Sequence, residues 1–174
     1  INSDGTLEAV SAVTDIGDGQ RTQMAMIAAE ATGIPYEQTT ISFEVDTAFT
    51  SDTGTTAGSR QTNSGGMGMY EAGTDARNQV LEWAAKKFVS DASRLTPPQK
   101  ITVTAAELDV RKGEVFYKND PSKKMLVRDA VQFSRGPIIG RGMHQPIPGF
   151  NRTAHYAHAA EIEVDTMSGT ITVL

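Results

Sequence analysis

Two glycine-rich stretches, each directly followed by a helical pattern, constrain this chain more than any other feature. The first is the turn over 15–20, with Gly17 and Gly19, and the second is the loop over 51–66, with Gly58. Glycine permits left-handed backbone and a close approach of the chain to a ligand. Since each stretch feeds a helix, bare backbone N–H groups are expected at two positive helix ends, which suits phosphate or pyrophosphate. We therefore expect a bulky anionic ligand, a cofactor, held between the two stretches.

Length and charge exclude several classes of protein. The 174 residues fit about one domain, and the net charge of -5 argues against a nucleic-acid partner or an acidic membrane surface. The chain has no cysteine, so it carries no disulfide, iron–sulfur cluster or thiolate zinc site. No apolar run approaches the roughly 18 residues that span a bilayer, and no signal peptide is visible at the start. These features predict a mildly acidic, cytoplasmic protein.

Hydrophobic periodicity predicts an α+β fold, with helices packed on a mixed or antiparallel sheet. A break at 96–99 divides the single domain into sub-regions of about 1–95 and 96–174. The predicted elements are a strand over 7–14, a helix over 20–32, a strand over 40–45, an irregular loop over 46–66, a helix over 67–90, hairpin strands over 107–111 and 114–118, a strand running into a helix over 126–133, and strands over 154–164 and 170–174.

The first candidate site is the turn at Ile16, Gly17, Asp18 and Gly19. Its two glycines allow a ligand to approach the backbone, and the following Arg21 is suited to pairing with a phosphate. Asp18 argues against direct contact between its own side chain and a phosphate, because two anions repel in a dry site. The structural alternative is a tight turn that needs glycine only for its positive φ.

The second candidate site combines hydroxyl, amide and guanidinium groups at Gly58, Ser59, Arg60 and Gln61. A polar loop of about 20 residues without periodicity is uncommon in a compact domain and is usually functional. The structural alternative is a capping loop in which Ser64 caps the helix that follows. The length and polarity of the loop favour ligand contact.

The remaining ionisable residues do not predict a metal or catalytic site. His155 and His158 are three apart on a predicted strand, so their side chains face opposite ways, and His144 is isolated. Glu161 and Glu163 resemble the solvated side of a strand edge rather than an acid–base pair. We therefore assign no catalytic residue and no metal ligand within these residues.

Three segments carry a family resemblance that covers nearly the whole chain. They are VTDIGDGQRTQMAMIAAEATGIPYEQTTI, DTGTTAGSRQTNSGGMGMYEAGTDAR and AAEIEVDTMSGTITVL. In order and spacing they resemble the molybdopterin-binding large subunit of molybdenum hydroxylases, the xanthine dehydrogenase and aldehyde oxidase family. The resemblance implies a molybdenum–pterin cofactor gripped by Ile16, Gly17 and Asp18 on one loop and by Gly58, Ser59, Arg60 and Gln61 on the other. The family usually has Gly-Gln-Gly where this chain has Gly17-Asp18-Gly19.

The same resemblance implies part of an enzyme that hydroxylates a heterocycle or an aldehyde oxidatively. Its catalytic glutamate would lie in a segment outside these 174 residues, so the chain is expected to be an inactive fragment when alone. The implied partners are the remaining molybdopterin-domain segments, iron–sulfur and FAD domains or subunits, and a small-molecule substrate. Two alternatives remain open, a cofactor-free assembly module with the same fold and a generic phosphate-ester-binding domain.

Overall fold

The computed structural model describes residues 1–42, 46, 48, 50, 52–144 and 157–174 and confirms the α+β class. Its strands form three small sheets rather than one, with orders β1-β2, β3-β4-β5 and β6-β7. The elements are β1 (Leu7–Val10), α1 (Gln20–Thr32), η1 (Tyr36–Gln38), β2 (Thr39–Ser42), η2 (Gln61–Gly65), α2 (Gly66–Ser93), η3 (Ala105–Glu107), β3 (Leu108–Arg111), β4 (Glu114–Tyr117), β5 (Asp120–Leu126), α3 (Val127–Ser134), β6 (Ile162–Val164) and β7 (Ile171–Val173).

Residues 7–42 form a strand–helix–strand unit. β1 and β2 pair in parallel, with Leu7 opposite Thr39, and α1 forms the crossover between them. The helix predicted over 20–32 is confirmed at both ends, and Gly33 ends it in the left-handed conformation. The strand predicted over 7–14 is shorter than expected. Of the strand predicted over 40–45, the last three residues lie outside the described part of the chain.

The second long helix starts earlier than the sequence predicts. Gln61–Gly65 form a π-helical turn that runs directly into α2, so the prediction of an irregular loop up to residue 66 is wrong there. The glycine, serine and threonine content of this turn hides a helix from periodicity. Ser64 therefore lies inside the helical run, and the structural alternative in which it caps the helix is excluded. Residues 52–57 have no regular structure, as predicted.

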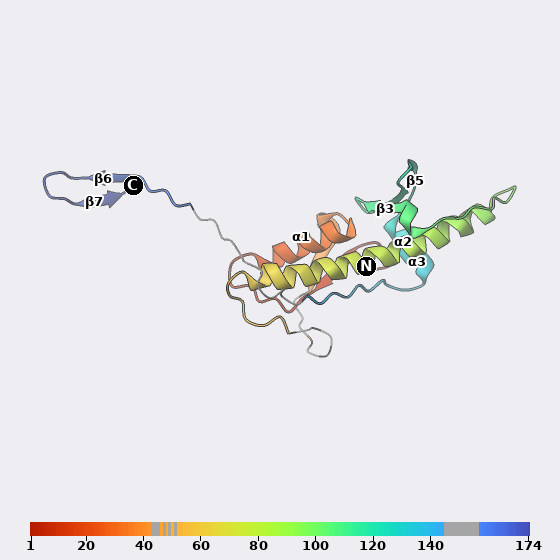
Figure 1. Cartoon of the computed structure of the whole chain (residues 1–174), viewed down its shortest axis with the longest axis horizontal. Helices are drawn as coiled ribbons and strands as arrows, with labels where there is room; N and C mark the ends of the chain where they lie inside the picture. Colours follow the sequence, from red (N-terminus) through yellow and green to blue (C-terminus); the bar gives the residue numbers. More distant parts are fainter. Residues whose placement is uncertain (43–45, 47, 49, 51, 145–156) are drawn as a thin grey trace.

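α1 and α2 lie side by side and run in the same direction (Figure 1). The Thr62 hydroxyl donates to Gln23 Oε1 at 2.9 Å near the start of both helices. Further along, a Cβ on Gly73 would lie 2.5 Å from the Cβ of Ala31. Early residues of α1 thus contact early residues of the η2–α2 helix, and later residues contact later ones, as expected for parallel helices. The two helices therefore begin at the same end of the molecule, and the loops that precede them end there.

The antiparallel sheet β3-β4-β5 packs at the opposite end of α1. Its first hairpin turns at Lys112 and Gly113, as predicted, and both residues have positive φ. Gly113 N donates to the carbonyl of Gly33, which ends α1, at 2.9 Å. β5 was not predicted, and its alternation is weak because most of its side chains are exposed. Helices and sheet share one core, whose largest fully buried apolar side chains are Met24, Val80, Leu108, Val115, Val127 and Val131.

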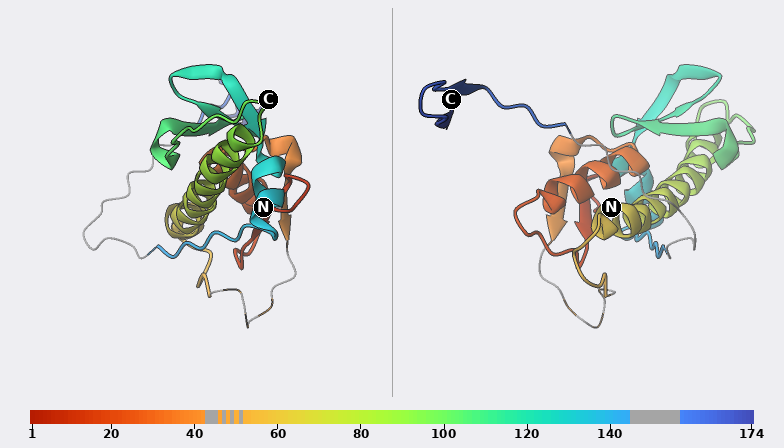
Figure 2. Two further views of the ribbon diagram at one scale, coloured as in Figure 1. Left: turned by 90° about the vertical axis from the view of Figure 1, so that its right-hand side faces the viewer. Right: turned by 60° about the vertical axis from the view of Figure 1, so that its left-hand side comes forward.

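After α3 the chain turns back along α2, and Figure 2 shows this extended segment beside the helix. β6 and β7 form a hairpin that stands apart from the other elements (Figure 1). The strand predicted over 154–164 is confirmed only at Ile162–Val164, and its first three residues lie outside the described chain. Among the described residues, no helix is both long and apolar enough to cross a membrane.

Candidate functional site

The two predicted loops meet at the end of the molecule where α1 and the η2–α2 helix begin. The Thr53 hydroxyl donates to the carbonyl of Ala12 at 3.1 Å, and the Thr56 hydroxyl donates to the carbonyl of Thr14 at 3.2 Å. These bonds lay the second loop against the residues that lead into the first. The structure therefore brings the two sequence-predicted stretches together, although 41 and 42 residues separate the bonded partners.

The first loop is shaped by glycines that need positive φ. Gly17 and Gly19 have φ values of 99° and 75°, and a Cβ on either would meet no atom of the described residues within 4 Å. Glycine is therefore required at these positions by the left-handed backbone and not by a lack of space. Ile16 is 67% exposed, and the exposed Asp18 accepts a hydrogen bond from the Gln20 side-chain amide at 2.8 Å.

The backbone amides of the first loop already donate hydrogen bonds to a carboxylate of the chain, that of Asp15. Gly17 N donates to Asp15 Oδ1 at 2.9 Å, and Arg21 N reaches Asp15 Oδ2 at 3.4 Å. The bond from Gly17 N, reinforced by those from the other amides, lowers the pKa of Asp15 below its ordinary value. The prediction that these amides are bare is wrong, because the carboxylate of Asp15, which precedes the helix, accepts from them.

The second loop turns into its helix through two successive left-handed residues. Gly58 and Ser59 have φ values of 55° and 59°, and Arg60 N closes the turn by donating to the carbonyl of Ala57 at 3.0 Å. A Cβ on Gly54 would lie 2.7 Å from Cζ of Arg60, so the exposed guanidinium folds back over that glycine. The loop thus presents a cation beside a helix start.

Gln61 points inward and braces the second loop. Its side chain is only 1% exposed, and its amide nitrogen donates to the carbonyl of Gly54 at 3.2 Å and to the Thr56 hydroxyl at 3.1 Å. The residue therefore fixes the loop from within. Sequence alone gives no signal for this role, because glutamine is usually exposed.

Within the part of the chain that the structure describes, three buried polar atoms at the helix starts have no hydrogen-bond partner: Gln20 Oε1, Gln61 Oε1 and Ser64 Oγ. The residues Gln20 and Gln61 are 5% and 1% exposed. Buried polar groups in proteins are almost always bonded. Three of the five such atoms in the described residues therefore lie in the first turns of the two helices.

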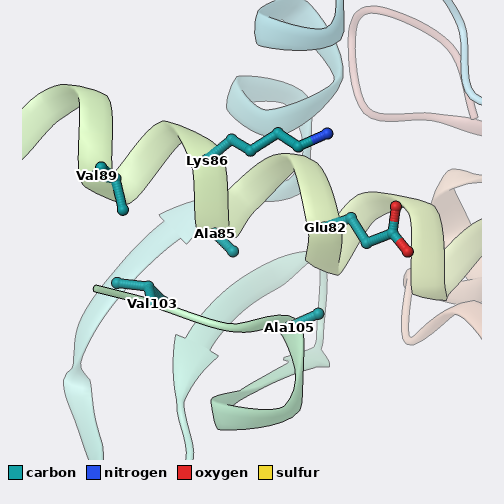
Figure 3. A pocket seen from close by; sticks show the side chains of 6 residues that line it. All are labelled: Glu82, Ala85, Lys86, Val89, Val103 and Ala105. Atoms are coloured by element: carbon teal, nitrogen blue, oxygen red, sulfur yellow. The ribbon is translucent and has the colours of Figure 1, made fainter. Parts of the chain in front are cut away.

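Other parts of the structure fit a site less well. A shallow pocket between α2 and the segment before η3 is lined by Glu82, Ala85, Lys86, Val89, Val103 and Ala105, none of them a predicted site residue (Figure 3). The Lys86 ammonium lies 4.2 Å from the centre of the Trp83 ring. Within the described residues no group of three or more histidine and acidic side chains is placed to hold a metal.

His144, which the sequence analysis treated as isolated, has a partner in the structure. Its Nδ1 lies 3.0 Å from Oε1 of Glu71, across 73 residues of sequence. No sequence pattern links two residues so far apart. His155 lies outside the described residues, and His158 is exposed.

A family model described as a molybdopterin cofactor-binding domain matches residues 1–174 of the chain. The match covers the whole length, and it places both loops and both helices within the domain. The chain belongs to this family. A comparison with curated proteins found no match.

Solved structures of two enzymes share the fold. Quinoline 2-oxidoreductase from Pseudomonas putida 86 matches 99% of this chain and 21% of its own, with a TM-score of 0.62 and 19% identity. Cu,Mo-CO dehydrogenase, in its carbon monoxide reduced state, matches 82% of this chain and 17% of its own, with a TM-score of 0.60 and 22% identity. The reconstituted CO dehydrogenase from Oligotropha carboxidovorans gives the same TM-score and identity. The chain thus spans about a fifth of these proteins, and the likeness shows the fold alone.

Proposed function

We propose that this chain forms part of a molybdenum hydroxylase and holds the molybdenum–pterin cofactor where α1 and the η2–α2 helix begin. One observation carries the proposal: in a chain of the molybdopterin-binding family, two parallel helices start side by side at glycine loops, and buried polar atoms in their first turns lack partners within the described residues. Parallel helix dipoles add at their shared positive end. The residues proposed to contact the cofactor are Ile16, Gly17, Asp18, Gly19, Gly58, Ser59 and Arg60, and Gln61 is proposed to support them from within the second loop.

The two loops differ in electrostatic character, which supports an orientation for the cofactor. On the first loop, Asp15 already fills the amide cradle and Asp18 adds a second carboxylate. Such a surface accepts N–H donors, which a pterin ring provides, and repels phosphate. On the second loop, Arg60 and the Ser59 hydroxyl suit an anionic tail. We therefore place the pterin donors at Asp18 and the phosphate at Ser59 and Arg60.

When bound, the cofactor would supply the metal-centred oxidative hydroxylation of a heterocycle or an aldehyde. The described residues contribute binding and orientation, and they include no group that we assign as the catalytic base. Iron–sulfur clusters would belong to other domains or subunits, since the chain has no cysteine. We propose the same for FAD. These partners, a small-molecule substrate and a cytoplasmic location remain proposals.

The assignment of Arg60 is tested in the complete assembly that contains this chain. Arg60→Ala should lower the molybdenum and pterin content per chain at least severalfold, whereas Arg60→Lys should retain part of it, because a lysine keeps the charge but loses the planar fork. Arg94→Ala is the matched control, since Arg94 is exposed just after the opposite end of α2. Normal cofactor content in Arg60→Ala would refute the role of this loop.

The apolar face of the β6–β7 hairpin supports further partners in an assembly. Ile162 pairs with Val173 and Val164 pairs with Ile171, so all four side chains share one face, and each is at least 47% exposed. The other face carries polar residues, such as Glu163. An isolated two-stranded hairpin is marginal in water. We propose that this face packs on another segment of the assembled molybdopterin-binding subunit.

A second candidate function, a cofactor-free assembly module, is favoured by the two carboxylates of the first loop. If that alternative holds, Asp18→Gln leaves the protein unchanged by any measure, because no ligand contacts the residue. Under the proposed function the same substitution exchanges an acceptor for an amide that also donates, and the cofactor content should change. Equal cofactor content with and without the substitution, at a detectable level of molybdenum, would remove Asp18 from the site.

A further inference from the structure

Residues 138–144, the strap, lie against α2 with their backbone almost in contact with that of the helix. A Cβ on Gly140 would lie 2.0 Å from the carbonyl oxygen of Ala72, and one on Gly142 would lie 2.1 Å from that of Gly68. Any side chain at either position would collide with rigid helix backbone. The glycines are therefore required by the close approach of the two segments, and the strap runs antiparallel to α2.

Three polar side chains spaced four residues apart on α2 fix the strap. Gln79 Nε2 donates to the carbonyl of Ile139 at 2.9 Å. Asp75 Oδ2 accepts from Arg141 N at 3.0 Å, and Gln79 Nε2 also reaches Asp75 Oδ2 at 3.1 Å. Residues at i, i+4 and i+8 share one face of a helix. Asp75 and Gln79 therefore lie in one row with Glu71, which contacts His144.

The strap ends beside the start of α2, where the second loop enters the helix. A Cβ on Gly68 would lie 3.6 Å from the backbone nitrogen of His144, whose side chain is 19% exposed and contacts Glu71. On another face, Gly73 contacts α1 through Ala31. The first turns of α2 are thus held from two sides, by α1 and by the strap.

We propose that Glu71 and His144 are positioning residues, which hold the start of α2 and thereby keep loop 58–61 in its cofactor-binding form. The inference rests on the proposed function for its cofactor readout, but the ordering of the loop is a property of the chain itself. The contact joins a carboxylate oxygen of Glu71, whose side chain is 41% exposed, to the imidazole of His144, whose side chain is 19% exposed. A hydrogen bond to an ionised group is stronger than one between neutral groups. Its loss would free the strap at the end nearest the loop.

The test compares Glu71→Ala with Glu71→Gln in the intact assembly. Glu71→Ala should release molybdenum and pterin about tenfold faster and raise amide hydrogen exchange in residues 58–66, with little change elsewhere. Glu71→Gln should lie between Glu71→Ala and the unaltered protein, because its side-chain oxygen still accepts from Nδ1–H but without the charge. His144→Ala should match Glu71→Ala, and the double variant should add little to either, since both changes remove one interaction. Glu82→Ala, an exposed acid on the same helix, is the control.

Three outcomes would overturn the inference: unchanged exchange at 58–66 in Glu71→Ala, additive effects in the double variant, or exchange that rises equally throughout the chain. The last result would mark a purely structural contact. An assembly without molybdenum or pterin would instead refute the proposed function. In that case the hydrogen-exchange comparison would still test whether the Glu71–His144 contact orders residues 58–66.

Discussion

At the scale of single residues, Asp15 ties stability to pH. Its folded-state pKa lies below the ordinary 3.8, mainly because Gly17 N donates to it. A lowered folded pKa gives stability that is present above the unfolded pKa and lost as pH falls through the folded value. Asp15→Asn keeps the acceptor and removes the charge. It should therefore lower the urea midpoint at pH 7, and the difference should shrink toward zero well below pH 3.8.

The matched control for this prediction is Glu82→Gln, an exposed acid on α2 that should give the same urea midpoint as the unaltered protein at both pH values. A difference for Asp15→Asn that is equally large at low pH would contradict the charge-dependent role of Asp15.

One glycine within the strap, Gly142, and one just before it, Gly136, allow a second prediction at this scale. In Gly142→Ala the new Cβ would meet helix backbone, 2.1 Å from Gly68 O and 2.4 Å from Ala72 N, so the strap must move away. Overpacking of this kind costs about 1–3 kcal/mol. In Gly136→Ala the new Cβ meets none of the described residues within 4 Å, and the change should be neutral or stabilising by less than about 1 kcal/mol. Equal thermal stability of the two variants would contradict the packing of the strap.

At the scale of elements, the parallel pair α1–α2 sets the geometry of the site. Gly73→Ala places a Cβ 2.5 Å from the Ala31 Cβ and should push the helices apart, lowering the free energy of unfolding. Ala31→Gly removes the obstructing atom, at a propensity cost of about 1 kcal/mol. The double variant should therefore be more stable than the sum of the single changes predicts. Strict additivity in denaturant unfolding would contradict the close contact of these two helices.

Local pattern predicted the elements better than their arrangement. The helix over 20–32 and the hairpin at Lys112-Gly113 follow from periodicity and turn chemistry, which act over a few residues. The parallel direction of α1 and α2 does not, because it depends on contacts between residues some 40 apart, such as Gln23 and Thr62.

The candidate site shows the same division. Its two loops were visible as glycine-rich stretches, and their meeting is a matter of tertiary structure. The inward direction of Gln61 and the pairing of His144 with Glu71 could not be predicted from the sequence, because both depend on tertiary structure and no local pattern encodes either contact.

At the scale of the whole molecule, the β6–β7 hairpin predicts how the chain joins its partners. Val173→Lys puts a charge on the apolar face and should weaken co-purification of the chain with its assembly, because a buried unpaired charge is costly. Thr172→Lys, on the opposite face and opposite Glu163, is the matched control and should assemble normally. Assembly that is weakened equally by both variants would show that the apolar face has no special part.

The central claim is that this chain holds a molybdenum–pterin cofactor as part of a larger enzyme. The most direct measurement is made on the assembly purified from its natural source through this chain: intact mass, molybdenum by elemental analysis, and pterin released on denaturation. We predict a complex heavier than 18.6 kDa with molybdenum and pterin in a ratio near one to each other and to the chain. An assembly that contains this chain but neither molybdenum nor pterin would contradict the claim.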